Sequence, residues 1–375
     1  NKSLTRRGGS FQRGAPSMRF EAAFLCCILL GCSISSVAEA AAVSLQRSQI
    51  LGQGMYVQGT GWYENNFYTT LTNYSSGESF LAWYAVDGDA WQQQGKIYVG
   101  QCNRTSAMMV ATDLIYPAIY LACGTDGDIL LQVALKTLAV SSILHPPPKT
   151  PPIIKSLTFP NLQTSIWTLT RNFLSQVDIT NNNVLGDIGS EDLRIDGVND
   201  KERYFFYSKL DHHTPPSFTE VLKLDISGKD WIYTAGITTS PYVLGNLVYV
   251  PELKAVLGLG NTWSAEISAF PSFFYFDADD LSVKANYTLP LAPPATSQGA
   301  YWDTTLSNYF ALTQQSVVQI SPEGKFIAQA IFPTTCPLNP QTSGCRVEPD
   351  SISVGRKKAF TYVATVNMYD SKGIP

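Results

Sequence analysis

The heptapeptides Lys223-Leu224-Asp225-Ile226-Ser227-Gly228-Lys229 and Gln319-Ile320-Ser321-Pro322-Glu323-Gly324-Lys325 share one pattern, in which an apolar residue precedes a polar turn opener and small or polar residues follow. Related phrases recur along the chain, with openers at residues 87, 136, 178, 225, 277, 321 and 370, at steps of 42 to 52 residues. The opener is usually Asp, whose side chain favours turns. Self-similarity at this period indicates a repeat architecture, and short strands between such turns predict a β-propeller.

Strands within a repeat are located by runs of β-branched and aromatic residues between Gly, Pro, Asn and Ser. The clearest repeat predicts strands at 299–304, 308–313, 316–320 and 326–331. Two others predict strands at 193–198, 203–210, 219–226 and 229–237, and at 246–251, 255–260, 272–277 and 281–289. Little helix is expected, because no stretch after the leader has a 3.6-residue apolar period. The chain is therefore predicted to be all-β, a single β-propeller of seven four-stranded blades, with six and eight blades as alternatives.

Two hairpin units, Leu224 to Lys229 and Ile320 to Lys325, resemble those of the broad quinoprotein-like and YVTN-like β-propeller superfamily. The resemblance covers most of residues 50–375 as architecture, implies the fold alone and carries over no functional residue. The one Trp-Asp pair, Trp302-Asp303, falls on an expected inner strand instead of closing a third strand, so the repeat does not resemble WD40.

The N-terminal region has the pattern of a secretory signal. Residues 1–17 precede the first Met and are interpreted as an upstream leader outside the mature protein. Residues 18–40 combine Arg19, a 13-residue apolar run at 22–34, and small residues Ala38 and Ala40, which is typical of a signal peptide. A membrane-spanning helix needs about 20 residues, so an uncleaved anchor or a buried helix is the weaker reading. We expect a secreted, monomeric propeller at 41–375 with no membrane span after cleavage.

The seventh repeat ends at Ile374-Pro375, just after its expected third strand and turn. Either the segment around Ser48 to Gly54 supplies the missing outer strand and closes the ring, or the sequence is truncated at its C-terminus. The stop inside a turn favours the second interpretation. The Pro-rich run at 145–152 and the segment between Cys336 and Cys345 are expected to be loops between blades, because the repeat continues across both.

The cysteines fit an oxidising compartment. Three of seven leave with the signal, and the remaining four are predicted to form two disulfides. Three pairings are open, of which Cys102 with Cys123 and Cys336 with Cys345 are local. Three sequons predict N-glycosylation at Asn73, Asn103 and Asn286.

Charge argues against nucleic acid as a partner. Removal of residues 1–40 leaves 21 basic and 28 acidic residues, a formal charge of −7. Nucleic-acid binding requires clustered Lys and Arg. The only cationic run, Arg356-Lys357-Lys358, lies where a hairpin turn is expected.

Candidate sites for chemistry are few, and no cofactor is predicted. Asp211, His212 and His213 are weak candidates for a metal site, because adjacent residues of an extended segment point to opposite faces. A second possibility is a set of carboxylates near inner strands, which glycoside hydrolysis would require to converge: Glu191, Asp192, Asp196, Asp200, Glu348 and Asp350. The sequence favours an extracellular binding or scaffold module for a protein or glycan, with no catalytic residue assigned. The alternative is a secreted hydrolase with carboxylates at the channel mouth.

Overall fold

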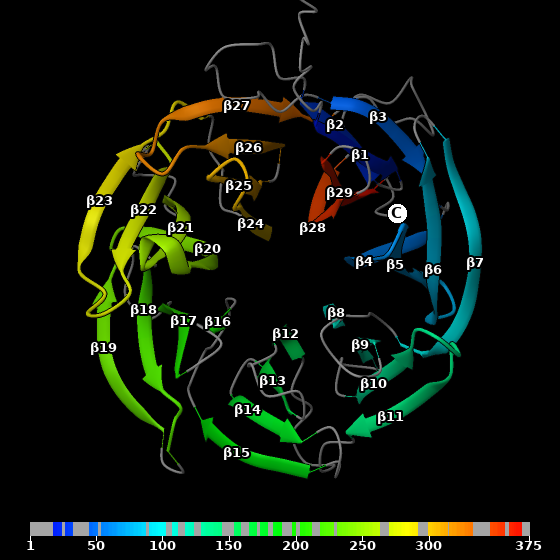
Figure 1. The fold of residues 1–375 in the computed structure, drawn as a ribbon, viewed down its shortest axis with the longest axis horizontal. Helices are drawn as coiled ribbons and strands as arrows, with labels where there is room; N and C mark the ends of the chain where they lie inside the picture. Colours follow the sequence, from blue (N-terminus) through cyan, green and yellow to red (C-terminus); the bar gives the residue numbers. More distant parts are fainter. Residues whose placement is uncertain are drawn as a thin grey trace, which may run out of the picture.

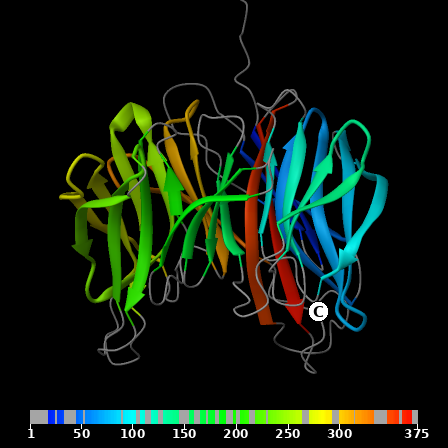
Figure 2. The ribbon, with the colours of Figure 1, turned by 90° about the horizontal axis from the view of Figure 1, so that it is seen from below.

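The computed structural model is a ring of β-sheets around a central axis, shown face-on in Figure 1 and from the side in Figure 2. The sheets stand side by side like blades, each with one strand near the centre and its last strand on the outside. This arrangement is a β-propeller, so the predicted all-β single propeller is confirmed. The structure describes residues 18–24, 27–32, 45–51, 54–87, 90–102, 107–111, 117–123, 129–144, 154–158, 165–170, 173–178, 183–189, 197–199, 203–211, 218–228, 231–262, 270–291, 299–313, 315–332, 346–356 and 360–369.

Six sheets each contain four antiparallel strands. In each of these sheets the strands follow one another in chain order from the centre of the ring outward. Sheets 1 to 3 are formed by β4 (Met55–Tyr63), β5 (Asn66–Asn73), β6 (Glu78–Asp87) and β7 (Ala90–Gln101); by β8 (Ala107–Ala111), β9 (Ala118–Cys123), β10 (Ile129–Ala134) and β11 (Val140–Leu144); and by β12 (Ile154–Thr158), β13 (Ser165–Thr170), β14 (Phe173–Asp178) and β15 (Asn183–Gly189). Sheets 4 to 6 are formed by β16 (Gly197–Asn199), β17 (Tyr204–Asp211), β18 (Phe218–Asp225) and β19 (Ile232–Thr238); by β20 (Tyr242–Val250), β21 (Ala255–Thr262), β22 (Ser272–Asp277) and β23 (Val283–Thr288); and by β24 (Gly299–Asp303), β25 (Asn308–Leu312), β26 (Ser316–Ile320) and β27 (Phe326–Ile331).

Burial explains why the strands differ in sequence. Among the second and third strands, β21, β25 and β26 are buried at every position because neighbouring sheets cover both of their faces. They therefore carry near-continuous apolar runs. The outer strands β19 and β23 alternate between exposed and half-buried residues, because their outward side chains face solvent.

The hydrophobic core lies between sheets, with no single centre. One cluster joins sheets 5 and 6, where the Phe273 and Tyr309 rings have centroids 5.0 Å apart. The Trp302 indole N–H also donates to Glu252 Oε1 at 2.5 Å across the same boundary. Other clusters join sheets 1 and 2 and sheets 4 and 5. Each sheet thus depends on its neighbours, as expected for a repeat protein.

Most strand predictions agree with the structure. In sheet 6 every predicted boundary lies within one residue of the observed one. The segments 145–153 and 332–345 connect different sheets, as expected of inter-blade loops, and Trp302 lies on the inner strand β24. Within the described residues the only helical element is a short 3-10 turn, η1 (Pro251–Leu253), which confirms the expected low helix content.

One predicted first strand is only partly described. The strand expected at 193–198 overlaps β16, which spans Gly197 to Asn199, and residues 193–196 lie outside the described residues. β16 pairs with β17 from Gly197 opposite Tyr207 to Asn199 opposite Phe205. The strand expected from Asn246 instead starts at Tyr242, because a bulge between Leu244 and Leu247 extends its pairing.

A closing sheet joins the two ends of the chain. Its five strands lie in the order β28 (Arg346–Arg356), β29 (Phe360–Tyr369), β2 (Cys27–Cys32), β1 (Met18–Phe24) and β3 (Leu45–Ile50). β3 occupies the outer edge, the place considered above for the segment around residues 48–54, whereas β1 and β2 fall within the predicted signal peptide.

The expected position of the last turn opener is wrong. Asp370 follows β29, which pairs directly with the innermost strand β28 and is therefore second in its sheet, not third. The reason is strand length, because β28 and β29 have 11 and 10 residues and fill the stretch from Arg346 to Tyr369 with two strands.

No helix among the described residues is long and apolar enough to span a bilayer.

Candidate functional site

The two faces of the ring differ in how strands are connected. At one face, here called the turn face, first strands join second strands and third strands join fourth strands. Within the six four-stranded sheets its longest connections have six residues, as at 226–231, and in the closing sheet the 12-residue connection 33–44 also joins strand ends at this face. At the opposite face, here called the loop face, lie the ends joined by five of the six longest connections: 145–153, 190–196, 263–271, 289–298 and 332–345. Binding residues concentrate on connections presented by a rigid scaffold, so the loop face is the candidate functional face.

The recurring Asp residues belong to the turn face and hold its turns. Asp225 Oδ1 accepts hydrogen bonds from the Ser227 N–H at 3.0 Å and hydroxyl at 2.7 Å. Asp277 Oδ1 accepts from the Asp279 N–H at 2.7 Å. Asp303, fully buried, does the same for the turn after β24. Turn formation therefore accounts for these carboxylates, as their sequence context predicts.

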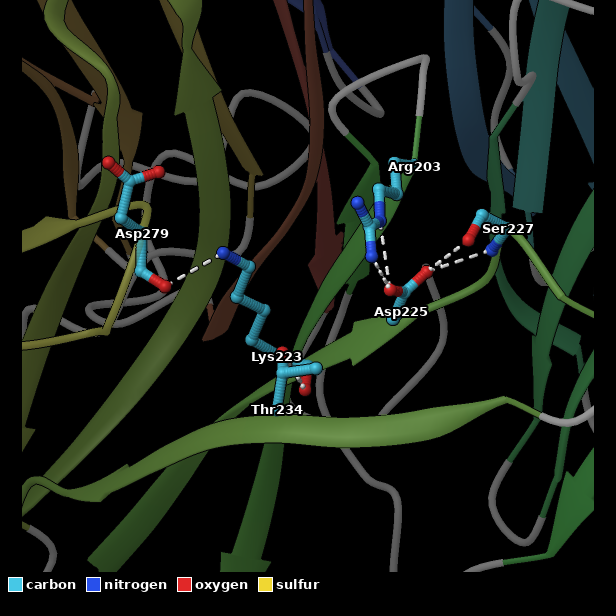
Figure 3. Close-up of polar contacts among 6 residues, drawn as sticks. All are labelled: Arg203, Lys223, Asp225, Ser227, Thr234 and Asp279. Atoms are coloured by element: carbon cyan, nitrogen blue, oxygen red, sulfur yellow. Dashed lines mark hydrogen bonds and ion pairs between the residues drawn. The ribbon is translucent and has the colours of Figure 1, made fainter.

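Basic side chains reinforce the turn face (Figure 3). Arg203 Nε donates to Asp225 Oδ2 at 2.8 Å, and this bond together with the Ser227 bonds holds the pKa of Asp225 well below its usual range. Lys284 lies 2.7 Å from Asp277 Oδ2, which lowers the pKa of that carboxyl and raises the pKa of the lysine.

Lys223 links two sheets at the same face. Its side chain is almost fully buried, and Nζ donates to the Asp279 carbonyl at 2.8 Å. Nζ also lies 3.8 Å from the centroid of the Tyr204 ring, which is a cation–π contact. The charge thereby ties β18 to the β22–β23 turn, which is a structural task.

A rigid corner of the loop face is built from sheets 1 and 2. Cys102, directly after β7, forms a disulfide with Cys123, the last residue of β9, with the two Cα atoms 5.0 Å apart. The buried Ser79 hydroxyl donates to the Cys102 carbonyl at 3.1 Å and lies 2.6 Å from the Thr72 hydroxyl. These contacts fix the β5–β6 connection relative to the start of the β7–β8 connection.

Exposed groups gather at this corner, and we call Tyr56, Tyr74, Ser76, Glu78 and Gln101 the corner surface. The Tyr74 side chain is 46% exposed, and its ring centroid lies 5.3 Å from that of the half-buried Tyr56. The Ser76 hydroxyl donates to Glu78 Oε2 at 3.0 Å, and Gln101 Nε2 donates to the Ser76 carbonyl. An aromatic face beside a carboxylate and amides can bind a ligand by stacking and hydrogen bonding.

Sequence reasoning missed the corner surface. Its residues come from β4, the β5–β6 turn, the start of β6 and β7 and have no characteristic spacing. The register that brings Glu78 opposite Gln101 is set by strand pairing, and the sequence does not specify it directly.

The predicted metal candidates are only partly described. Asp211 is the last residue of β17 at the loop face, whereas His212 and His213 lie outside the described residues. Among the residues that the structure describes, no group of three or more His, Cys, Asp or Glu is placed to hold a metal ion.

The predicted carboxylates are likewise not brought together by the described structure. Glu348 and Asp350 lie on β28, the innermost strand of the closing sheet, with a pairing irregularity at Asp350 between Pro349 and Ser351. The others lie outside the described residues: Glu191, Asp192, Asp196 and Asp200.

The remaining predicted sites are divided between described and undescribed segments. The disulfide between Cys102 and Cys123 is compatible with the local pairing considered above, and Cys336 and Cys345 fall outside the described residues. Asn73 and Asn286 are described and Asn103 is not.

Comparison with known proteins supports the architecture alone. No protein-family model matches the chain. Comparison of the sequence with curated proteins finds no relative. Among solved structures, similarity extends to hydrazine synthase of Kuenenia stuttgartiensis, with 12% identity, a TM-score of 0.56, and coverage of 71% of this chain and 76% of that one.

Two further solved structures are similar over most of their length. A putative 6-phosphogluconolactonase of Bacteroides fragilis has 7% identity and a TM-score of 0.57, with coverage of 87% of this chain and 100% of that one. A protein from Lactobacillus plantarum has 10% identity and a TM-score of 0.59, with coverage of 83% and 94%. At these identities the similarity shows the β-propeller fold and says nothing of function.

Proposed function

We propose that this chain is a secreted seven-bladed β-propeller that recognises a protein or glycan through its loop face, without catalysing a reaction. The observation that carries the proposal is the asymmetry between the faces. In the six four-stranded sheets the turn face has short connections whose Asp residues are engaged in turns, whereas five of the six longest connections between described strands join ends at the loop face. Six four-stranded sheets and a closing sheet support the blade number.

The corner surface is the best-described part of that face. Its exposed Tyr74 offers a flat apolar surface, and Ser76, Glu78 and Gln101 add donors and acceptors beside it. The Cys102–Cys123 disulfide holds these groups in place before a ligand arrives. Such preorganisation lowers the entropic cost of binding.

Secretion rests on the leader and the disulfide, since disulfides persist mainly in oxidising compartments. Residues 18–32 cannot both be removed with a signal peptide and remain as β1 and β2. N-terminal sequencing of the purified protein separates the two fates. A mature N-terminus near Ala41 supports cleavage, whereas a chain that retains residues 18–32 contradicts it.

Binding is tested with the labelled full chain on a glycan microarray and on an array of extracellular proteins. We expect a discrete set of bound spots and a loss of about tenfold in affinity for Tyr74→Ala, the size of one interfacial hot spot. Tyr98→Ala is the matched control, because Tyr98 is 52% exposed and its ring also contacts another, that of Phe80, but it lies on the rim strand β7. Equal losses in the two variants, or no bound spot on either array, would contradict the proposal.

A hydrolase is the second candidate, favoured by one observation. Glu348 and Asp350 lie on an innermost strand with a bulge at Asp350, and bulges occur often beside active sites. Turnover of a panel of chromogenic glycosides by the full chain, abolished in Glu348→Gln, would replace the binding proposal with this one.

A further inference from the structure

The sequon at Asn286 lies on the outermost strand of sheet 5. Along β23 the exposed residues alternate, so that Lys284, Asn286 and Thr288 face solvent while Ala285 and Tyr287 are half-buried. Tyr287 packs against the cluster between sheets 5 and 6, and its ring lies against Gly324 of the next sheet. This contact locks the orientation of β23, so the acceptor and the sequon hydroxyl stay on the outward face.

The carboxamide of Asn286 is not engaged by the fold. Among the described residues it has no hydrogen-bond partner, whereas its outward neighbour Lys284 pairs with Asp277. The second described sequon differs, because Asn73 is half-buried and its Oδ1 accepts hydrogen bonds from the Ser75 and Ser76 N–H groups at 2.9 and 3.0 Å. Asn73 holds a turn, and Asn286 has no structural task in the described part of the chain.

We infer that Asn286 carries an N-linked oligosaccharide on the rim of sheet 5, an inference that rests on the proposed secretion. In the transfer step, Nδ2 of Asn286 bonds to the anomeric carbon of a polyprenyl-diphosphate-linked oligosaccharide. The bond from that carbon to the diphosphate oxygen breaks, the lipid diphosphate leaves, and Nδ2 loses one proton. The folded chain accommodates the product, because the sugar extends from an outward-facing position into solvent.

The position also defines which surface stays free. A sugar at Asn286 covers the unpaired edge of β23 and blocks pairing with a strand of another molecule. Lys284, two residues before Asn286 on the same face of β23, already supplies a charge on that edge. The oligosaccharide would project from the rim and leave the corner surface on sheet 1 accessible.

The test is expression of the full chain in eukaryotic cells in two forms, one with its own leader and one preceded by a strong heterologous signal peptide. Glycosidase release in heavy-oxygen water followed by peptide mass spectrometry reports each sequon separately. We expect label at Asn286 in both forms, loss of one glycan from the gel shift in Thr288→Ala, and retention of it in Thr288→Ser. Thr288 is exposed, so neither variant should disturb folding.

The outcomes distinguish the two proposals. If only the heterologous form is exported and it is labelled at Asn286, the acceptor inference stands and the secretion proposal fails. If chain that has entered the secretory pathway, identified by label at Asn73 or Asn103 or by export, is unlabelled at Asn286, the inference is overturned. A gel shift that persists unchanged in Thr288→Ala overturns it as well.

Discussion

Two glycines with nearly the same backbone conformation allow the packing between sheets 5 and 6 to be measured. Gly54 has a φ of +69° and Gly324 a φ of +71°, both in the left-handed region that disfavours other residues. An added β-carbon at Gly54 would have no neighbour within 4 Å. At Gly324 it would lie 1.9 Å from Cδ2 and 2.0 Å from Cγ of Tyr287. Replacement of either glycine by Ala therefore carries a similar cost for the left-handed backbone conformation. Only the replacement at Gly324 also places the β-carbon against the Tyr287 ring.

The expected costs follow from these contacts. The left-handed conformation costs a non-glycine residue about 1–2 kcal/mol, partly offset by the lower entropy of the unfolded chain, so Gly54→Ala should lower the free energy of unfolding by about 1 kcal/mol. In Gly324→Ala the ring must also move. Because Cγ is the first ring atom, it moves only with a change of side-chain rotamer or of the β23 backbone. Overpacking of this kind adds about 1–3 kcal/mol, for a total of about 2–4 kcal/mol.

The measurement is urea-induced unfolding of the wild type and both variants, with comparison of slopes to check that each unfolds in the same manner. In a Tyr287→Ala background the clashing ring is gone. Adding Gly324→Ala to that background should then lower the free energy of unfolding by no more than Gly54→Ala lowers it in the wild type. Equal costs for the two single glycine substitutions, or a full cost at Gly324 without the ring, would refute the packing of sheet 5 on sheet 6 described above.

Three further predictions concern charge, the disulfide and the core. The pKa of Asp225 is lowered from 3.8 in the folded state, so its stabilising contribution is present above about pH 4 and is lost as the pH falls below that value. The loss of stability in acid should therefore be shallower in Asp225→Asn than in the wild type. Thermal melts from pH 6 to pH 2 measure this difference. The disulfide joins two cysteines 21 residues apart, and its removal in Cys102→Ser/Cys123→Ser should lower the free energy of unfolding by about 2–4 kcal/mol relative to the oxidised wild type. Titration of free thiols in the oxidised wild type should detect neither Cys102 nor Cys123. Phe273→Ala, at a fully buried ring against Tyr309, should cost about 3–5 kcal/mol in the same urea assay, and Phe273→Leu clearly less; similar costs for the two would argue against a tightly packed boundary.

Local sequence signals predicted the strands best where turn residues bracket each of them. In sheet 6 Gly299 and Asn308 are the first residues of β24 and β25, and the Ser321-to-Lys325 turn separates β26 from β27, so 316–320 and 326–331 agree with these two strands. The long β28 was harder to predict. Its length depends on pairing with β29, which a single strand's residues do not encode.

The repeat phrase itself indicates where binding residues should not be sought. A turn opener that recurs from blade to blade meets a requirement that the blades share, and Asp225 and Asp277 each meet it by accepting a backbone N–H group in a turn. Recognition of one ligand needs a surface that differs from blade to blade. Gln101 belongs to such a surface, because the outer strands of the other four-stranded sheets end in Leu144, Gly189, Thr238, Thr288 and Ile331. The loop face at sheets 1 and 2 is therefore where substitutions should alter binding without altering the fold.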